Sequence, residues 1–342
     1  MDHWYLTAPR TATCLSEPVP QPGPGEVLVR IAHTAISPGS NVHLWRSGSY
    51  AAAATEMREE LLYMGAGVVS GIGSGVSSVA AGDRVVVATG HQAYVVAKES
   101  GVHRVPADLP LREAAISYLC SWSVSALHLG RYRAAETVVV VGQGLVGASS
   151  ALVADVMGAR VLGLDVAEPR VAFARALGVG AVEQPGAQGA DERIAAFLAP
   201  SGPDLILETT GSWHGLRQAI TLARDYTRIA VMGIYRQPPP PDLGMELFGL
   251  LNSYPSKFHY GRLNIIGVGS DPEVVVPPAP HLATRASNWA YVLWQAARGR
   301  LPLGRLITHV LPPDQVGVAL EELAGGPTSM VGVVFDWPDA AA

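Results

Sequence analysis

The sequence has few of the residues that build disulfide frameworks, metal sites or basic surfaces. Its 342 residues include two cysteines, Cys14 and Cys120, too few for a disulfide framework or a four-thiolate zinc site. With two lysines and a net charge of −5, it offers no basic patch for nucleic acid. It also lacks a membrane-length apolar run and the basic and apolar segments of a signal peptide. We expect a cytoplasmic protein without nucleic-acid or membrane partners.

The segment Thr137–Gly147 (TVVVVGQGLVG) predicts a strand, a phosphate-binding turn and the start of a helix. The β-branched run 138–141 is typical of a buried parallel strand. Gly142 permits the tight turn, Gly144 lets the backbone approach a pyrophosphate, and Gly147 lets the helix pack closely on the sheet. The phosphates then lie at a helix N-terminus, which favours negative charge. The predicted phosphate-binding residues are Gly142, Gly144, Leu145, Val146 and Gly147.

Asp165 ends the next predicted strand, 18 residues after the last glycine of the turn. A carboxylate at this point accepts hydrogen bonds from both ribose hydroxyls and repels a 2′-phosphate. The sequence therefore favours NAD(H) over NADP(H). Arg170 keeps NADP(H) as the less favoured alternative, because a guanidinium can turn toward a phosphate.

Strands and helices alternate from about residue 137 to 268, as in a doubly wound sheet. Four further strands are predicted, at 181–184, 204–208, 228–232 and 263–268. Ligands bind at the carboxyl ends of such strands, so we expect coenzyme contacts just after the fourth and fifth strands. These residues are Thr209, Thr210, Gly211 and Gly233. The proline run 238–241 predicts a surface loop.

The segments on either side of this region have a different character. Before about residue 110 they are β-rich and punctuated by turns, and the tail after 272 is too short for a core of its own. The tail most simply completes the N-terminal part. We therefore expect one domain from residues 1–113 and 272–342, and a dinucleotide-binding domain from residues 114–271.

These motifs together resemble the medium-chain dehydrogenase/reductase superfamily. The resemblance covers nearly the whole chain and includes PGPGEVLVRI, AISPGSNVHLW, the GDRV at Gly82–Val85, the coenzyme motif and the closing MVGVVF. It implies an α/β fold in which a Rossmann domain, with its doubly wound parallel sheet, is inserted in a GroES-like β-rich catalytic domain. It also implies hydride transfer to or from a nicotinamide. Family members pair the sixth strand across a dimer, which predicts a homodimer here.

The sequence departs from the zinc-dependent members of this family at the metal ligands. Pro38 stands where they carry a cysteine ligand, and Tyr63 and Met64 stand where they carry a His-Glu pair. The four-cysteine lobe of their structural zinc is missing, and Cys120 alone lies where a third ligand belongs. One thiol without partners cannot complete a tetrahedral zinc shell. We therefore expect a zinc-free alcohol-dehydrogenase-like member.

Without a metal, other groups have to manage the proton and the substrate oxygen. Ser40 and His43 match the proton relay of the resembling alcohol dehydrogenases, although both could instead have local structural roles. Tyr63 could donate a hydrogen bond to a carbonyl oxygen or form an aromatic wall. The residues predicted to line a substrate pocket are Trp45, Tyr50, Tyr118, Cys120, Trp122 and Tyr235.

Three function classes remain open. The first is a zinc-independent oxidoreductase that acts with NAD(H) on a secondary alcohol or ketone, with a bulky or cyclic biosynthetic intermediate as the small-molecule substrate. The second is an NAD(P)H-dependent reductase of an activated C=C or C=N bond, which needs less polarisation of an oxygen. The third is a non-catalytic dinucleotide-binding protein. The pair Ser40 and His43 favours the first class, because an alcohol needs a route for its proton.

Overall fold

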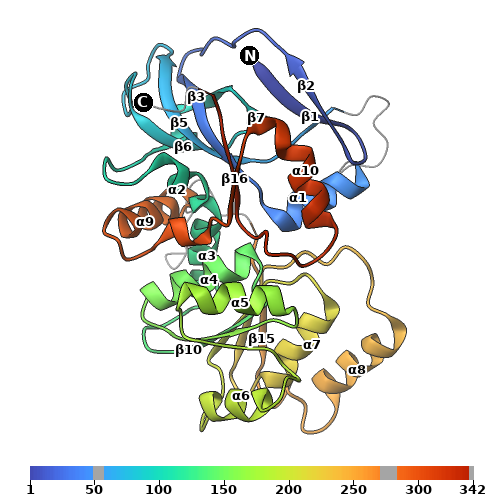
Figure 1. Cartoon of the computed structure of the whole chain (residues 1–342). Coiled ribbons are helices and arrows are strands. Elements are labelled where there is room, and N and C mark those ends of the chain that lie inside the picture. The colour runs from blue at the N-terminus through green and yellow to red at the C-terminus, as the bar shows by residue number, and fades with distance from the viewer. Residues whose placement is uncertain (49–57, 270–282, 339–342) are drawn as a thin grey trace. The chain divides into compact units, whose positions relative to one another are not determined.

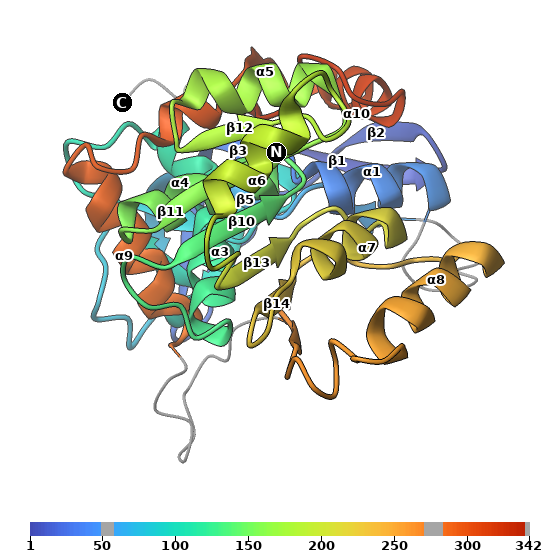
Figure 2. The same ribbon diagram turned by 90° about the horizontal axis from the view of Figure 1, so that it is seen from below.

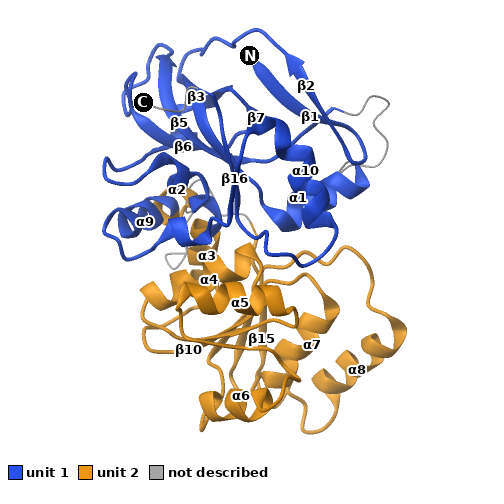
Figure 3. Cartoon of the chain, viewed as in Figure 1, with its two compact units in different colours: residues 1–119, 289–342 blue, residues 120–288 orange. Residues whose placement is uncertain are grey.

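The computed structural model describes residues 1–48, 58–269 and 283–338 (Figure 1). The chain forms two compact units, coloured separately in Figure 3. Unit 1 consists of residues 1–119 and 289–342, and unit 2 of residues 120–288. The boundaries expected from the sequence, after residues 113 and 271, stay predictions, and the second lies outside the described residues.

Unit 1 is built on two β-sheets. The smaller one has the order β2-β1-β4, with β7 also paired to β1, and the larger one has the order β16-β17-β3-β5-β6-β9, with β8 paired to β3. The strands are β1 (Asp2–Ala8), β2 (Thr11–Ser16), β3 (Glu26–Ala35), β4 (Glu59–Glu60), β5 (Met64–Ile72), β6 (Arg84–Val87), β7 (His91–Gln92), β8 (Tyr94–Lys98), β9 (Val102–Arg104), β16 (His309–Leu311) and β17 (Val333–Asp336). Because β17 pairs antiparallel with β3, the tail completes the sheet that the N-terminal segment begins.

Two helices of unit 1, α1 (Pro38–Ser47) and α10 (Val316–Ala324), pack together over a hydrophobic core. Leu44 and Trp45 of α1 and Leu320 of α10 belong to this core, which β17 joins through Phe335. Helix α1 begins with Pro38 in its first turn, where proline has no hydrogen bond to lose. The other helices with residues in unit 1 are α2 (Leu111–Ala115), α3 (Ser117–Leu129) and α9 (Arg285–Ala297), the last two shared with unit 2.

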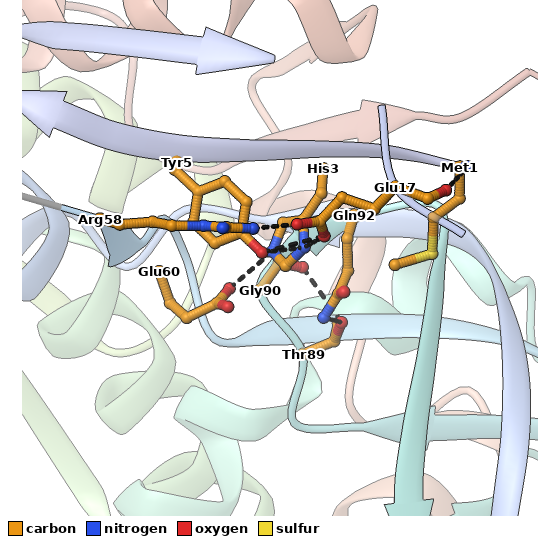
Figure 4. Close-up of polar contacts among 9 residues, drawn as sticks. All are labelled: Met1, His3, Tyr5, Glu17, Arg58, Glu60, Thr89, Gly90 and Gln92. Atoms are coloured by element: carbon orange, nitrogen blue, oxygen red, sulfur yellow. Dashed lines mark hydrogen bonds and ion pairs between the residues drawn. The ribbon is translucent and has the colours of Figure 1, made fainter. Parts of the chain in front are cut away.

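A polar network around His3 joins the strands of the smaller sheet (Figure 4). His3 is 4% exposed, and its Nδ1 and Nε2 lie 2.9 Å from carboxylate oxygens of Glu17 and Glu60, respectively. The hydroxyl of Tyr5 also donates to Glu17, 3.1 Å away, and Arg58 forms an ion pair with the same carboxylate. Strand β4 pairs with β1 through two residues only, and the Glu60 carboxylate adds a side-chain contact between β4 and His3 of β1.

Unit 2 contains a six-stranded parallel sheet of order β12-β11-β10-β13-β14-β15 (Figure 2). The strands are β10 (Thr137–Val141), β11 (Arg160–Leu164), β12 (Ala181–Glu183), β13 (Leu205–Glu208), β14 (Arg228–Val231) and β15 (Asn264–Gly267). All six strands lie where the sequence predicts them, and their order is that of a complete dinucleotide-binding fold. The Rossmann-type architecture predicted from the glycine turn is therefore confirmed.

Helices connect the strands of unit 2 and cover the sheet. They are α4 (Leu145–Val156), α5 (Glu168–Leu177), α6 (Ala190–Leu198), α7 (Trp213–Leu222) and α8 (Pro241–Asn252). Alternate residues of the strands, such as Val139, Leu162 and Ile206, share one core with α6, α7 and α8. The expected loop at 238–241 is wrong at its end, because Pro241 starts α8, a position where proline's missing N–H costs nothing. No described helix is both long and apolar enough to cross a bilayer.

Candidate coenzyme site and catalytic region

The turn between β10 and α4 has the shape that its glycines require. Gly142 has φ +92°, a conformation that side chains disfavour, and an added Cβ would lie 2.7 Å from Thr209 Oγ1. At Gly147 an added Cβ would lie 1.8 Å from the carbonyl oxygen of Gly142. Both positions therefore disfavour a side chain: Gly142 because of its φ and its contact with Thr209, and Gly147 because the helix packs against the turn itself.

Gly144, the N-cap of α4, behaves differently from these two glycines. An added Cβ there would meet no atom within 4 Å, and no side chain of the described residues caps the helix. The first N–H groups of α4, from Leu145 and Val146 onward, are then available to an outside acceptor. Open space at a helix N-terminus beside a tight turn fits a pyrophosphate. The residues present therefore fit a dinucleotide coenzyme.

The Asp165 carboxylate follows β11 and is bound to the backbone of the turn. Its Oδ2 accepts the N–H of Gln143 at 2.6 Å, and its Oδ1 accepts the N–H of Ala167 at 2.9 Å. Each oxygen keeps a second lone pair, so both can still accept ribose hydroxyls. Burial lowers the pKa of Arg170, while the charge of Asp165 acts in the opposite direction. The side chains of Asp165 and Arg170 therefore interact electrostatically.

The other predicted coenzyme residues lie together at the carboxyl ends of β13 and β14. Thr209 donates its hydroxyl to the carbonyl oxygen of Val141, 2.9 Å away, which ties the end of β13 to β10. Gly211 has φ +62°, and an added Cβ at Gly233 would lie 2.1 Å from its nitrogen. Sequence reasoning missed the side chain that joins these segments, Glu208. The available signal was a charged residue ending a buried strand.

Ser40 and His43 lie one helical turn apart on α1, and both are half-buried. The helix is fixed at its start by Asn41, whose side-chain oxygen accepts the N–H of Ser37 at 2.8 Å. The structure thus holds the two predicted relay residues on one regular element of unit 1.

Tyr63 and Tyr118 form an aromatic pair in unit 1. Their ring centroids are 5.7 Å apart with an interplanar angle of 78°, and both residues are half-buried. Trp289 packs against Tyr118 at 5.3 Å and is 2% exposed. Its Nε1 donates to Ser117 Oγ at 2.7 Å, so the indole is fixed behind the pair. Trp289 and Ser117 lie far apart in the sequence, and no local pattern identified them.

Of the other predicted pocket residues, Trp45 belongs to unit 1, whereas Trp122 and Tyr235 belong to unit 2. Trp45 is 3% exposed in the core of unit 1, and its Nε1 donates to Glu321 at 2.8 Å. In unit 2, Trp122 donates to the carbonyl oxygen of Gly269 at 3.2 Å. The Tyr235 hydroxyl of the same unit donates to Glu208 at 2.6 Å. Tyr50 lies outside the described residues.

The donor set of the described residues does not fit a catalytic zinc. Pro38 and Met64 offer no ligand, and Met64 is fully buried at the start of β5. Cys120 is also fully buried, and burial raises the pKa of its thiol to about 12. Across residues 1–48, 58–269 and 283–338, no three His, Cys, Asp or Glu side chains are grouped to hold a metal ion. One thiol without partner ligands cannot complete a tetrahedral zinc shell.

Comparison with known proteins agrees with this architecture. Residues 23–107 match the family model of the alcohol dehydrogenase GroES-like domain, and residues 146–268 match that of zinc-binding dehydrogenases. The L-threonine 3-dehydrogenase of Rhizobium rhizogenes is 26% identical over 351 residues, which cover 94% of this chain and 93% of that protein. The chain belongs to the medium-chain dehydrogenase/reductase superfamily. It is an oxidoreductase of the alcohol-dehydrogenase-like type.

Solved structures show the same fold across the whole length of this medium-chain dehydrogenase/reductase. An Escherichia coli oxidoreductase/dehydrogenase of unknown specificity has a TM-score of 0.83 at 21% identity and covers 99% of both chains. An alcohol dehydrogenase of E. coli CFT073, solved with NADH, has a TM-score of 0.77 at 19% identity. The match covers 98% of this chain and 99% of that protein. A putative zinc-binding dehydrogenase of Sinorhizobium meliloti 1021, solved with NADP, also has a TM-score of 0.77, at 17% identity and with 98% of both chains covered. Structures of this fold therefore hold either dinucleotide.

Proposed function

We propose that this protein transfers a hydride between NAD(H) and a secondary alcohol or its ketone, without zinc. The observations that support the proposal are an intact coenzyme turn and described residues among which no three zinc donors are grouped. The Asp165 carboxylate supports NAD(H) over NADP(H), because its free lone pairs suit ribose hydroxyls and its charge opposes a 2′-phosphate. Arg170 is the residue through which NADP(H) would compete.

Ser40 and His43 are the proposed proton-transfer residues. When bound, the coenzyme accepts or supplies the hydride. Oxidation of an alcohol also releases the hydroxyl proton, which the Ser40 hydroxyl receives and passes to the His43 imidazole, since histidine exchanges protons near neutral pH. Tyr63 is the proposed donor to the substrate oxygen, because a phenol provides a hydrogen bond where the metal would otherwise polarise the carbonyl.

The aromatic pair supports a bulky or cyclic substrate. Tyr63 and Tyr118 are half-buried and edge-to-face, and Trp289 behind them has its polar atom satisfied within unit 1. The rings of the pair therefore offer an apolar surface beside the Tyr63 hydroxyl, which suits a cyclic molecule that carries an oxygen. We propose a cyclic biosynthetic intermediate as the natural substrate.

A second candidate function is the NAD(P)H-dependent reduction of an activated C=C or C=N bond. The same aromatic pair favours it, because two tyrosines polarise an oxygen less strongly than a metal ion and such bonds need less polarisation. In that reaction Ser40 and His43 have no alcohol proton to carry. Their substitution therefore separates the two candidates.

The test follows NADH absorbance while the protein is incubated with a panel of cyclic alcohols, ketones, enones and imines. The zinc content of the same protein sample is measured in parallel. Turnover of alcohols and ketones, with less than a tenth of an equivalent of zinc, is the expected result. Turnover confined to enones or imines selects the second candidate. One zinc per chain that survives extensive washing with a chelator would contradict a zinc-free reaction.

We also propose that the protein is a cytoplasmic homodimer paired through β15. Strand β15 is bonded on one side only, to β14, within the described part of the chain. Large apolar side chains nearby in the sequence are exposed, including Phe248 at 62% and Tyr254 at 84%. An open apolar edge is a surface that a second copy would cover. Ile265→Lys should shift sedimentation from dimer to monomer, and a monomeric wild type would contradict the proposal.

Both cysteines are unpaired, which suits the cytoplasm.

A further inference from the structure

Glu208 is a buried acidic residue at the carboxyl end of β13, and the proposed hydride and proton chemistry does not use it. The residue is fully buried. Its strand lies between β10, which leads into the glycine turn, and β14, as Figure 2 shows. In a doubly wound sheet this is the edge at which the coenzyme lies.

Hydrogen-bond donors surround the side chain of Glu208. Oε1 accepts the backbone N–H of Thr210 at 2.8 Å and the Thr210 hydroxyl, and Oε2 accepts the Tyr235 hydroxyl at 2.6 Å. Burial, and then the hydrogen bond and charge of Glu208, raise the pKa of Tyr235, so the phenol stays a donor. A carboxylate accepts all three of these hydrogen bonds at its two oxygens.

The charge of Glu208 is only partly compensated inside the protein. An added Cβ at Gly215 would lie 2.9 Å from Oε1, which places the carboxylate against the first turn of α7, where the helix dipole stabilises an anion. No arginine, lysine or histidine of the described residues forms an ion pair with Glu208. A buried carboxylate without a full counter-charge destabilises the folded protein. A positively charged ligand that binds nearby would reduce this cost.

Glu208 also fixes the two segments that the sequence assigns to the coenzyme. Its side chain holds Thr210, and its carbonyl oxygen accepts the N–H groups of Met232 and Gly233 at 2.8 and 3.1 Å. An added Cβ at Gly233 would lie 2.8 Å from Oε2. The negative charge therefore lies directly beneath these two strand ends.

We propose that Glu208 supplies the negative charge by which this site favours the oxidised coenzyme over the reduced one. The inference rests on the proposed binding of NAD(H). The nicotinamide ring carries a positive charge in NAD⁺ and none in NADH, so a nearby buried anion stabilises the oxidised form selectively. Glu208 is thus a positioning residue for both segments, and its charge sets the redox preference.

The experiment measures the dissociation constants of NAD⁺ and NADH by calorimetry on the full chain. In Glu208→Gln, binding of NAD⁺ should weaken roughly three- to tenfold more than binding of NADH. A purely structural role would weaken both equally, and an unchanged ratio of the two constants would overturn the inference. If the wild type binds neither coenzyme, the proposed function itself fails, so the two failures are distinguishable.

A second variant keeps the test informative if Glu208→Gln does not fold. Tyr235→Lys places a cation beside the intact carboxylate and should also reduce the preference for NAD⁺. Tyr235→Phe is the matched control, because it removes the phenol's donor and leaves the charge, so its ratio of the two constants should stay at least as high as that of the wild type. A Tyr235→Lys ratio equal to that of Tyr235→Phe would contradict the proposed charge effect.

Discussion

The glycine turn of unit 2 and the aromatic region of unit 1 hold their functional groups by different means. In the turn, the positive φ of Gly142 and the Gly142 carbonyl oxygen beside Gly147 leave no room for side chains at these two positions, so backbone geometry fixes the site. Around Tyr63 and Tyr118, geometry depends on rings packed against one another and on the Trp289–Ser117 hydrogen bond. Two glycines of the turn therefore cannot be replaced by larger residues. The side chains of the aromatic region, in contrast, can be substituted one at a time.

The largest effect should come from the turn. Gly147→Ala puts a methyl group 1.8 Å from the Gly142 carbonyl oxygen and should abolish coenzyme binding while destabilising the protein by roughly 1–3 kcal/mol. Gly144→Ala is the matched change in open space, and it should leave the free energy of unfolding within about 0.5 kcal/mol but weaken coenzyme binding at least ~10-fold. Calorimetry and denaturant unfolding measure the two quantities. Undiminished coenzyme affinity in Gly144→Ala would refute the assignment of this turn as the pyrophosphate-binding site.

The next effect concerns α1 in unit 1. His43→Ala should lower turnover of alcohols by roughly 100-fold and flatten its dependence on pH, because the proton loses its acceptor. Coenzyme affinity should change far less than turnover, since the proposed role of His43 is proton transfer. His214→Ala, which alters an exposed histidine of unit 2, is the control and should leave the pH profile as it is. Steady-state kinetics from pH 6 to 9 would show whether His43 matters at all.

A stability effect of about 2 kcal/mol is expected from His91. This imidazole is fully buried, with ring nitrogens 2.8 Å from Thr34 Oγ1 and from the carbonyl oxygen of Pro313, and burial lowers its pKa to about 3. The unfolded chain binds the proton more tightly, near the ordinary pKa of 6.5, so the stabilisation is complete above that pH and falls as the pH drops toward 3. Between pH 7.5 and 5 the loss should be about 2 kcal/mol. Equal pH slopes of unfolding in the wild type and His91→Gln would disprove this role.

The smallest effect is expected at the end of α7. Lys257 donates its Nζ to the carbonyl oxygens of Ile220, Thr221 and Ala223 at 2.8, 2.9 and 3.1 Å. Lys257→Met should therefore destabilise the protein by roughly 1–2 kcal/mol, because these acceptors lose a charged donor at a helix C-terminus. The other lysine, Lys98, is exposed, and Lys98→Met should change the free energy of unfolding by less than ~0.5 kcal/mol. Chemical denaturation of both variants gives the comparison.

The predictability of the fold follows the same contrast between the two units. Runs such as Val138–Val141 mark buried parallel strands, and all six strands of unit 2 lie close to their predicted positions. The two-residue strands β4 and β7 have too few residues for a periodic pattern, and β4 depends on the distant contact between His3 and Glu60. The local sequence cannot predict contacts between residues that lie far apart in the chain.

The candidate site divides in a similar way. Backbone-determined positions such as Gly142 could be predicted, because their conformation follows from the residue type. Side-chain positions could not: the indole N–H of Trp45 donates to Glu321, which is 276 residues away in the chain, and no local pattern indicates that contact. Glu208 was missed for the same reason, since two of its donors come from Thr210 but the third comes from Tyr235 on another loop.

The pairing of β17 with β3 has a consequence for the order of events on the ribosome. Unit 2 is a continuous stretch of chain, so it is able to fold once residue 288 has emerged. The larger sheet of unit 1 stays incomplete until β17 has been translated, after the whole of unit 2. Nascent β3 therefore lacks one of its neighbours until then. Premature termination late in synthesis would leave a folded unit 2 attached to an incomplete unit 1.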